Sequence, residues 1–305
     1  MREKIMVRMM GTVITLDIGA TNAKELIDNS VQLLRMYEKR FSANDPNSEL
    51  MAVNQAAGIR SIQVHPDLFK LIKLGKYHSC AADSHLNIAI GPLVKLWHIG
   101  FKDARVPSPE DIKKRLILIN PQKIELDEKT QSVYLQIPGM EIDLGALAKG
   151  FIADLIIDYL KEQQAESAML NLGGNVVVLG NAPTRDDGFY RIGIQDPLSS
   201  RNTYMTIIPV HNQSVVTSGV YERKLKIGDK TYHHIFDSKT GYPITSDISS
   251  LTIVSHHSVD GEIWTSRLFG KGILEILEVV GQLKNVECLI IDNQNKLYQS
   301  EIDIN

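Results

Sequence analysis

The chain has 305 residues, of which 43% are hydrophobic and 23% charged, so it can bury a substantial core. Its 33 basic and 36 acidic side chains nearly cancel, which gives no electrostatic reason to expect nucleic acid as a partner. Only two cysteines occur, so we expect neither a disulfide framework nor a metal site built on thiolates, and any metal should be bound by oxygen.

The N-terminus carries no recognisable targeting segment. Its apolar stretch is too short for the hydrophobic region of a signal peptide, and no cysteine there suits lipid attachment. No run approaches the length needed to span a bilayer. We therefore expect a cytoplasmic protein with no stable membrane anchor, although an exported form trimmed of its leader would have the same sequence.

The first quarter of the chain is predicted to hold one strand and three helical segments. Alternating residues over 13–19 predict the strand, and apolar residues at helical intervals predict a helix over 23–41. A polar loop with one proline follows, continued by a short helix from Ser48. A third helix is predicted over 66–84.

The remainder is predicted to mix short strands with helices. Alternating stretches between residues 127 and 144 predict a hairpin that turns at Pro138 and Gly139, and a long helix should begin near Ala146. Further strands are expected at 169–180, 190–197, 204–210, 214–218 and 249–255, followed by a helix near 273–283 and a strand at 288–292. Because strands and helices do not alternate strictly and no linker is visible, we predict an α+β fold over residues 1–305, in one domain of two interleaved lobes.

The most informative segment is IDLGALAKG, from Ile142 to Gly150. In the prediction, a strand that carries Asp143 turns through glycine into the long helix. A helix N-terminus offers free backbone N–H groups that favour phosphate, and Lys149 adds a positive charge in the first turn. The junction suits a diphosphate, although an aspartate before a helix is also an ordinary N-cap.

Two histidine pairs invite a zinc interpretation, which the spacing disfavours. His233 and His234 are adjacent, as are His256 and His257. Neighbouring residues on a strand point to opposite faces, and no third nitrogen or sulfur ligand sits at a suitable spacing. At most one histidine of each pair is expected to face a given site.

The segment DGEIWTS, from Asp260 to Ser266, offers two carboxylates and two hydroxyls. Glu262 and Ser266 are four residues apart, so on a helix they would share a face, rotated by only about 40°. Such oxygen ligands suit Mg²⁺, which shares phosphate oxygens with its substrate. The alternative is an ordinary helix start capped by Asp260.

Taken together and in order, segments of this sequence resemble the ApbE family, the FAD:protein FMN transferases. The resemblance spans nearly the whole chain. The matching segments are Met10–Thr12, Phe41–Ser42 with Asp45–Glu49 and Asn54, Gly91–Trp97, Ile142–Gly150, Asn171–Gly174, Ser218–Arg223, His234–Gly241 and Glu262–Phe269.

The resemblance implies an FAD held extended between two lobes, with Mg²⁺ on its diphosphate. Asp143 and Lys149 would contact FAD. The backbone carbonyl of Ala146 would join Glu262 and Ser266 as metal ligands.

Other matching positions would complete the FAD site. Met10 would line the flavin pocket, and His234 would lie beside the reactive phosphate or the ring system as a candidate general base. Ser42, Asn87 and Trp97 are the remaining expected contacts, although a tryptophan is as readily a core residue as a stacking surface.

Three departures from the family pattern stand out. Asn87 replaces the usual aspartate, and Ser238 follows Asp237 where the family has proline. The family's metal position is commonly an aspartate with a threonine four residues later, and here Leu268-Phe269 fixes the register, which places Glu262 and Ser266 there.

A second register would use Asp260 and Thr265 as metal ligands. It keeps the usual residue types but spaces them five apart, which on a regular helix rotates the two side chains by about 140°. We therefore prefer Glu262 and Ser266.

The implied reaction transfers FMN from FAD to a hydroxyl of an acceptor protein that carries a Ser/Thr-Gly-Ala-Thr/Ser sequence, and releases AMP. The base for that hydroxyl would be His234 or a carboxylate near the metal. Hydrolysis of FAD to FMN and AMP, or FAD binding without chemistry, are the alternatives. The chain's own Ile18-Gly-Ala-Thr21 lacks the leading hydroxyl residue and is predicted to be a turn.

Overall fold

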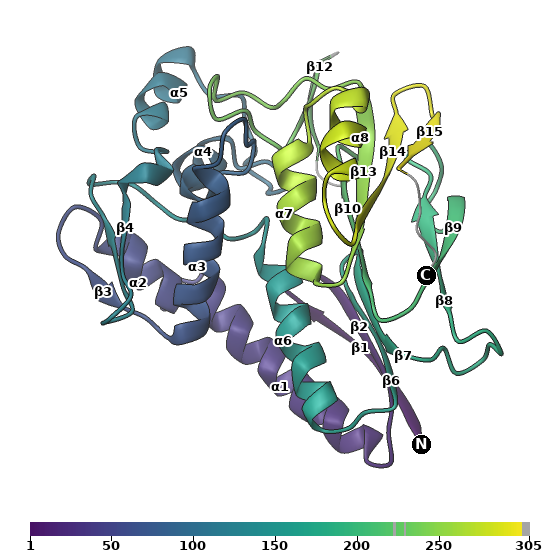
Figure 1. Ribbon diagram of the computed structural model, residues 1–305. Coiled ribbons are helices and arrows are strands. Elements are labelled where there is room, and N and C mark those ends of the chain that lie inside the picture. The colour runs from purple at the N-terminus through teal and green to yellow at the C-terminus, as the bar shows by residue number, and fades with distance from the viewer. Residues whose placement is uncertain (222–223, 229, 301–305) are drawn as a thin grey trace.

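An eight-stranded sheet is the largest element of the fold (Figure 1). The structure is a computed structural model that describes residues 1–221, 224–228 and 230–300. Neighbouring strands of the sheet pair antiparallel. In spatial order the strands are β1 (Arg2–Met9), β2 (Thr12–Gly19), β6 (Ser167–Leu172), β7 (Asn175–Gly180), β10 (Ser214–Gly219), β13 (Ile248–Ser255), β14 (Val286–Asp292) and β15 (Leu297–Gln299).

Two tight turns close hairpins in this sheet. Met10 and Gly11 join β1 to β2 with φ of 51° and 69°, and Gly173 and Gly174 join β6 to β7 with φ of 69° and 98°. Two successive positive φ angles make the type I′ turn, whose twist matches that of the paired strands. The left-handed Met10 is held by its N–H, which donates to the Glu38 carboxylate at 2.6 Å.

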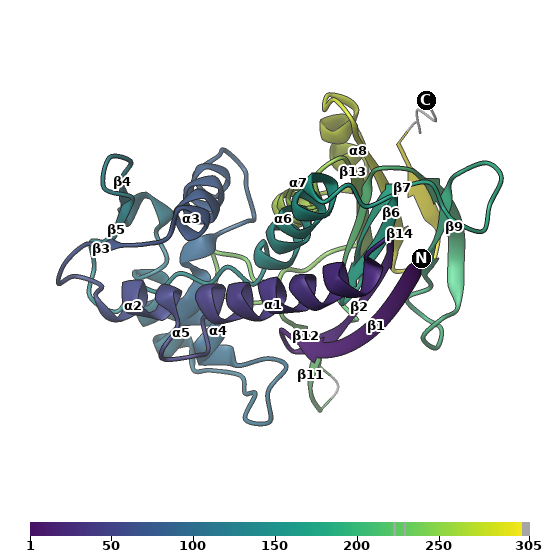
Figure 2. The same ribbon diagram turned by 90° about the horizontal axis from the view of Figure 1, so that it is seen from below.

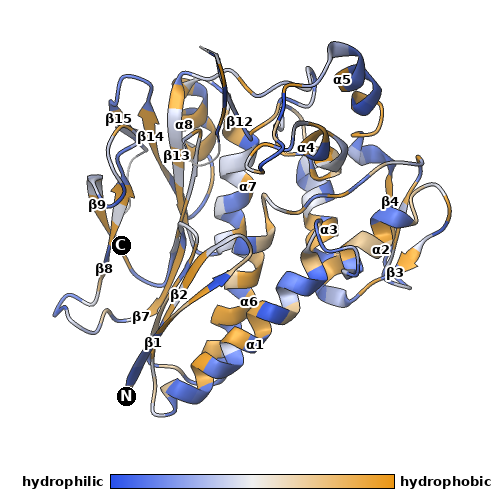
Figure 3. Cartoon of the chain, turned by 180° about the vertical axis from the view of Figure 1, so that it is seen from behind, coloured by the Kyte–Doolittle hydropathy of each residue, from blue (hydrophilic) through white to orange (hydrophobic). Residues whose placement is uncertain are grey.

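Helices cover one face of the sheet and a two-stranded sheet covers the other (Figure 2). Along β7, Val177 and Leu179 pack with the helices, whereas Val176 and Val178 pack against the second sheet. The sheet is therefore buried on both faces, and hydrophobic residues run along its strands (Figure 3). The covering helices are α1 (Ala23–Phe41), α6 (Ala148–Glu162), α7 (Ser258–Leu268) and α8 (Ile273–Gly281), and the second sheet is β8 (Tyr190–Gln195) with β9 (Tyr204–Val210).

The residues between α1 and α6 build a second lobe beside the sheet (Figure 1). It contains a small sheet in the order β3-β5-β4, surrounded by short helices. Its elements are α2 (Glu49–Gln55), β3 (Ile62–Gln63), α3 (Pro66–Ser79), α4 (Gly91–Trp97), α5 (Pro109–Leu116), β4 (Ile124–Asp127) and β5 (Ser132–Leu135), with 3₁₀ turns at Ile88–Ile90 and Pro121–Lys123.

A hairpin from the C-terminal half joins the two lobes. Strands β11 (Lys224–Ile227) and β12 (Lys230–His233) follow β10 but pack on α4 and α5. There Tyr232 and Phe236 share an apolar cluster with Trp97. The second lobe is therefore completed by residues that come more than 100 positions later in the chain.

Several predicted elements are confirmed and two are wrong. The helix predicted over 23–41 is α1, and the helix expected near Ala146 begins at Ala148. The hairpin predicted to turn at Pro138 and Gly139 instead pairs β4 with β5 and turns through residues 128–131. The Asp127 carboxylate opens that turn by accepting the Lys129 N–H at 2.9 Å, an Asx turn that the alternation pattern did not reveal.

The segment before α6 is also not the strand that was predicted. The Asn54 side chain replaces a strand partner there, since its Nδ2 donates to the Ile142 carbonyl at 2.9 Å and its Oδ1 accepts the Ile142 N–H at 2.7 Å. Within the ranges that the structure describes, no helix is both long enough and apolar enough to cross a bilayer.

Candidate active site

Lys149 and Glu262 meet where α6 packs against α7. Lys149 lies in the first turn of α6 and Glu262 in the middle of α7, and the lysine Nζ is 3.1 Å from Glu262 Oε1. The glutamate side chain is 6% exposed and the lysine side chain 29%. Two predicted site residues that are 113 positions apart in the chain are therefore in direct contact.

Gly150 allows this approach of the two helices. A Cβ atom at this position would lie 2.6 Å from the Ser258 carbonyl oxygen and 2.7 Å from Glu262 Cγ. Real Cβ atoms do not come that close to other atoms, so only glycine fits between α6 and α7 here.

The start of α7 is fixed by Asp154, one turn further along α6. Its carboxylate accepts the N–H of Ser258 at 2.7 Å and that of Val259 at 2.9 Å, which caps the helix. Burial raises the pKa of Asp154 to about 6, although these two hydrogen bonds act in the opposite direction. Residues of α6 therefore set where α7 begins.

The turn that leads into α6 carries Asp143 and Ala146. Asp143 Oδ1 accepts the Gly145 N–H at 2.7 Å, and the Asp143 N–H donates to the Ile88 carbonyl at 2.8 Å. Ala146 is exposed, and no side chain caps α6. The N–H groups of Leu147 and Ala148 donate to the Leu144 carbonyl at 2.9 and 2.8 Å, so any phosphate at this helix start would meet the N–H groups that follow them, beside Lys149.

The two registers proposed for the metal ligands differ in their surroundings. Thr265 is 0% exposed, and its hydroxyl donates to the Glu262 carbonyl at 3.2 Å within the helix. Asp260 is half-buried, and burial raises the pKa of its carboxyl. Ser266 is half-buried one turn after Glu262, so these two keep the shared helix face that the sequence predicts.

The proposed metal site does not contain a cluster of acidic side chains. Among the described residues, no group of three or more His, Cys, Asp and Glu side chains is placed to hold a metal. The proposed donors are one carboxylate, one hydroxyl and one backbone carbonyl, all oxygen atoms of the kind that Mg²⁺ accepts when phosphate oxygens and water complete its shell. The donor set therefore fits Mg²⁺ bound together with a diphosphate.

The adjacent histidines have different surroundings. His233 interacts through Nε2 with the Ile244 carbonyl at 2.7 Å, and its Nδ1 accepts the Ile235 N–H at 3.3 Å. Burial lowers the pKa of His233, in keeping with a neutral structural ring. His234 is half-buried and opens the stretch that crosses from β12 to the core beside α4.

Asn87 anchors that stretch. Its Nδ2 donates to the Ile119 carbonyl at 2.8 Å and to Ser238 Oγ at 3.2 Å. Two of the departures noted from the family pattern, Asn87 and Ser238, therefore touch one another. An aspartate at position 87 could not donate either bond, so the amide has a structural reason.

Trp97 contacts the same stretch, and its burial contradicts the expectation that its ring could stack on a flavin. It is 0% exposed, its Nε1 donates to the Gly241 carbonyl at 2.9 Å, and its ring packs on those of Tyr232 and Phe236. A side chain with no exposed surface cannot stack on a flavin in this structure. Its contribution is to fix the turn that follows His234.

Met10 and Ser42 make local contacts. Met10 is half-buried at the tip of the β1–β2 hairpin. Ser42 follows α1, and its hydroxyl accepts the N–H groups of Asn44 and Asp45 at 3.1 Å and 3.0 Å. Tyr221 packs over Gly219, while Glu222 and Arg223 of that matching segment lie outside the described residues.

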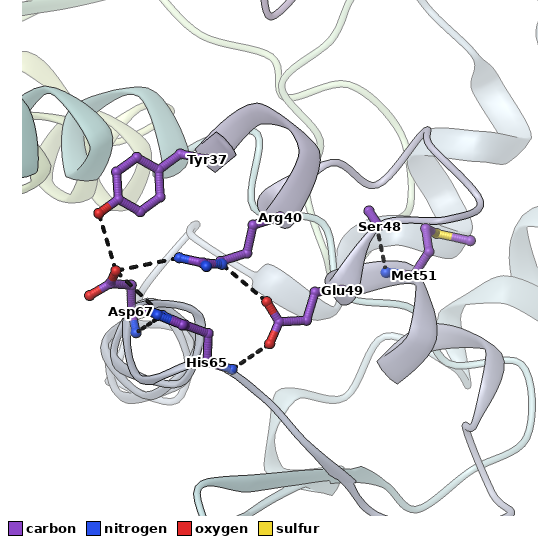
Figure 4. A network of polar contacts seen from close by, with 7 residues as sticks. All are labelled: Tyr37, Arg40, Ser48, Glu49, Met51, His65 and Asp67. Carbon is purple, nitrogen blue, oxygen red and sulfur yellow. Dashed lines mark hydrogen bonds and ion pairs between the residues drawn. The ribbon is translucent and has the colours of Figure 1, made fainter. Parts of the chain in front are cut away.

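A polar network fixes the ends of the loop that carries Ser42 (Figure 4). Arg40 contacts Glu49 at 3.1 Å and Asp67 at 3.6 Å, and the Tyr37 hydroxyl donates to Asp67 at 3.2 Å. Burial, reinforced by the negative charge of Asp67, raises the pKa of Tyr37 to about 12. The network ties α1 to the first turns of α2 and α3.

The sequence predictions missed two residues that organise the site, Asn175 and Asp154. Asn175 Nδ2 donates to Glu262 Oε1 at 3.1 Å. Both residues carried a signal, because each is a polar side chain in an otherwise apolar element, NVVVLG for Asn175 and FIADLII for Asp154. A buried polar group needs a partner, but the sequence does not say which.

The fold and the chain are similar to known proteins. The ApbE family model matches residues 10–290. The chain is 41% identical to an FAD:protein FMN transferase of Klebsiella pneumoniae over 96% of this chain and 90% of that protein. It is 31% identical to a protein of the same name from Treponema pallidum, over 89% and 78% of the two chains.

Solved structures agree in fold. The ApbE protein of Thermotoga maritima superposes with a TM-score of 0.90 at 23% identity, covering 99% of this chain and 97% of that chain. The flavin transferase ApbE of Vibrio cholerae superposes with a TM-score of 0.85 at 24% identity, with coverage of 99% and 97%. By its sequence match over nearly its whole length, this chain belongs to the ApbE family.

Proposed function

We propose that this chain transfers the FMN part of FAD to a Ser or Thr hydroxyl of an acceptor protein. The observation that carries the proposal is the contact of Lys149 with Glu262 beside the uncapped start of α6. It combines a partly exposed cation, a buried carboxylate and a helix N-terminus, groups that suit a diphosphate and its metal. The names of the relatives support the same activity.

Each residue of the site has a proposed task. Glu262, Ser266 and the Ala146 carbonyl would hold Mg²⁺, which would neutralise charge on the diphosphate. Lys149 and Asp143 would bind and orient FAD, and charge neutralisation by the lysine would stabilise the transferring phosphoryl group.

The proposed reaction is a phosphoryl substitution. The acceptor hydroxyl attacks the phosphorus on the FMN side of the diphosphate, a P–O bond forms to the acceptor, and the P–O bond to the AMP part breaks. The hydroxyl proton passes to a base, for which we propose His234, and AMP leaves. The acceptor would carry a Ser/Thr-Gly-Ala-Thr/Ser sequence.

The test is incubation with FAD, Mg²⁺ and an acceptor protein bearing that sequence. We expect the acceptor to gain covalently bound FMN and AMP to appear in equal amount, and both to be lost when the acceptor hydroxyl is removed. AMP released without an acceptor would instead indicate a pyrophosphatase. FAD binding that is indifferent to Mg²⁺ and to Glu262→Ala, with no product, would indicate a binding protein without chemistry.

Two lysine variants distinguish a specific role of Lys149 in FMN transfer from the general effect of removing a lysine. Lys149→Met should lower FMN transfer strongly, because it removes the cation at the helix start. Lys73→Met removes an exposed ion pair with Glu128, at 2.7 Å, and should leave transfer unchanged. Equal activity of the two variants would contradict the role of Lys149.

A further inference from the structure

Asn175 is a buried polar residue whose amide faces Glu262. It is 3% exposed at the first position of β7, directly after the Gly173-Gly174 turn. Its Nδ2 lies 3.1 Å from Glu262 Oε1, and its Oδ1 lies 2.5 Å from Ser258 Oγ. A carboxylate oxygen only accepts hydrogen bonds, so the NH₂ end of the amide must face Glu262, and the Ser258 hydroxyl then donates to the other end.

The position of Ser258 is itself fixed. Its backbone N–H is bound by Asp154, and its hydroxyl is buried with the residue 0% exposed. A continuous set of hydrogen bonds thus runs from Asp154 through Ser258 and Asn175 to the Glu262 carboxylate. It links α6, α7 and β7.

The two donors to Glu262 Oε1 differ in how freely they can move. Lys149 is a long side chain that is 29% exposed and can turn toward a ligand. Asn175 is a short side chain on a strand in the interior of the eight-stranded sheet, between β6 and β10. If Lys149 turns to a phosphate, Asn175 is the donor that remains on Glu262 Oε1.

The residue type also matters for a metal ligand. An amide orients a carboxylate without adding charge, so the full negative charge of Glu262 remains for a cation. A lysine or arginine in that place would compete with the metal, and an aspartate would repel Glu262.

We propose that Asn175 is a positioning residue that holds the Glu262 carboxylate in place for a divalent cation, with Ser258 fixing the amide. The inference rests on the proposed function, in which Glu262 binds Mg²⁺. Partners that orient a metal ligand typically change metal affinity by about 10- to 100-fold when they are removed.

The experiment measures the Mg²⁺ concentration that half-saturates FAD binding, followed by flavin fluorescence anisotropy, on the full chain. Asn175→Leu keeps the branching at Cγ in a somewhat larger side chain and removes both hydrogen bonds, so we expect roughly a 10- to 100-fold weaker Mg²⁺ response. Ser258→Ala leaves Asn175 present but free to turn, and should shift the response in the same direction by less.

The control is Tyr159→Phe, which removes a hydrogen bond between α6 and α1 at 2.9 Å and touches none of the residues above. It should leave the Mg²⁺ response unchanged even if it lowers the melting temperature. In a Glu262→Gln background, adding Asn175→Leu should change the response by no more than about twofold, the usual error of additivity. Such coupling distinguishes positioning of Glu262 from a general loss of stability.

The outcomes separate this inference from the proposed function. If Glu262→Gln weakens the Mg²⁺ response but Asn175→Leu melts cooperatively and stays within about twofold of the wild type, the positioning role is wrong. If Asn175→Leu does not fold, an unchanged response in Ser258→Ala overturns it. If Glu262→Gln itself has no effect, the metal assignment fails, and the role of Asn175 fails with it.

Discussion

The substitution Gly150→Ala tests whether the close approach of α6 and α7 builds the site. The new Cβ would sit 2.6 Å from the Ser258 carbonyl oxygen, about 0.8 Å closer than ordinary van der Waals contact. The Ser258 oxygen belongs to the backbone and the second neighbour, Glu262 Cγ, is buried, so neither atom can swing away. Overpacking of this kind costs about 1–3 kcal/mol. The better helix propensity of alanine offsets up to about 1 kcal/mol of that cost.

With the full offset, we expect the free energy of unfolding of Gly150→Ala, measured by urea titration, to fall by up to about 2 kcal/mol. The shift of α7 should also part Lys149 from Glu262, so Mg²⁺-dependent FAD binding should weaken. Gly281→Ala is the matched control, because it lies in α8 and its Cβ would meet nothing within 4 Å. That variant should be neutral or slightly more stable.

A Gly150→Ala variant that is as stable as the wild type and keeps its Mg²⁺ response would show that the close approach of α6 and α7 does not build the site. A variant that loses stability but keeps the Mg²⁺ response would show that the two helices can separate without disturbing the site.

Three further predictions concern single side chains. Burial raises the pKa of Asp154 from 3.8 to about 6, so its neutral form stabilises the folded chain below about pH 4. This contribution to the free energy of unfolding, up to about 3 kcal/mol, is lost as the pH rises through 6. In urea titrations over this pH range, Asp154→Asn should lack the fall. Burial, and then the charge of Arg267, lowers the pKa of His78 to about 4, so the neutral ring stabilises the folded chain above pH 6.5 and this stability is lost on acidification through pH 4. The free energy of unfolding of His78→Gln should therefore depend less on pH in the acid range. Ser266→Ala should weaken the Mg²⁺ response while the isosteric Thr265→Val leaves it intact, and the reverse result in the same titration would favour the register of Asp260 and Thr265.

Periodicity was sufficient for the long elements. The spacing of apolar residues predicted α1 to the residue, and the predicted strand stretches at 169–180, 214–218 and 249–255 contain most of β6, β7, β10 and β13. The short elements β11, β12 and α4 were missed because four to seven residues carry little pattern, although α2, as short as α4, was predicted from Ser48. Edge strand β1 was missed because its two faces differ little in polarity; even Met6 is 69% exposed.

The sequence predicted part of the candidate site. The family resemblance named Lys149 and Glu262, but nothing in the residues themselves said that these two would touch. That contact depends on Gly150 and on the cap that Asp154 gives to α7, both of which are tertiary features. Trp97 shows the opposite limit, because an aromatic residue in a matching segment looked available for stacking until its burial was known.

The order of the sheet has a consequence for synthesis of the chain. Strand β2 pairs with β6 through Gly19 and Ser167, so about 150 residues must be translated after the hairpin before its partner strand exists. At roughly 5–20 residues per second the apolar edge of β2 stays open for about 8 to 30 s. An open edge of this kind is a template for pairing with other chains, so a nascent chain should depend on chaperones during that interval. Glu262 emerges later still, and a nascent chain that ends before it cannot form the ion pair with Lys149.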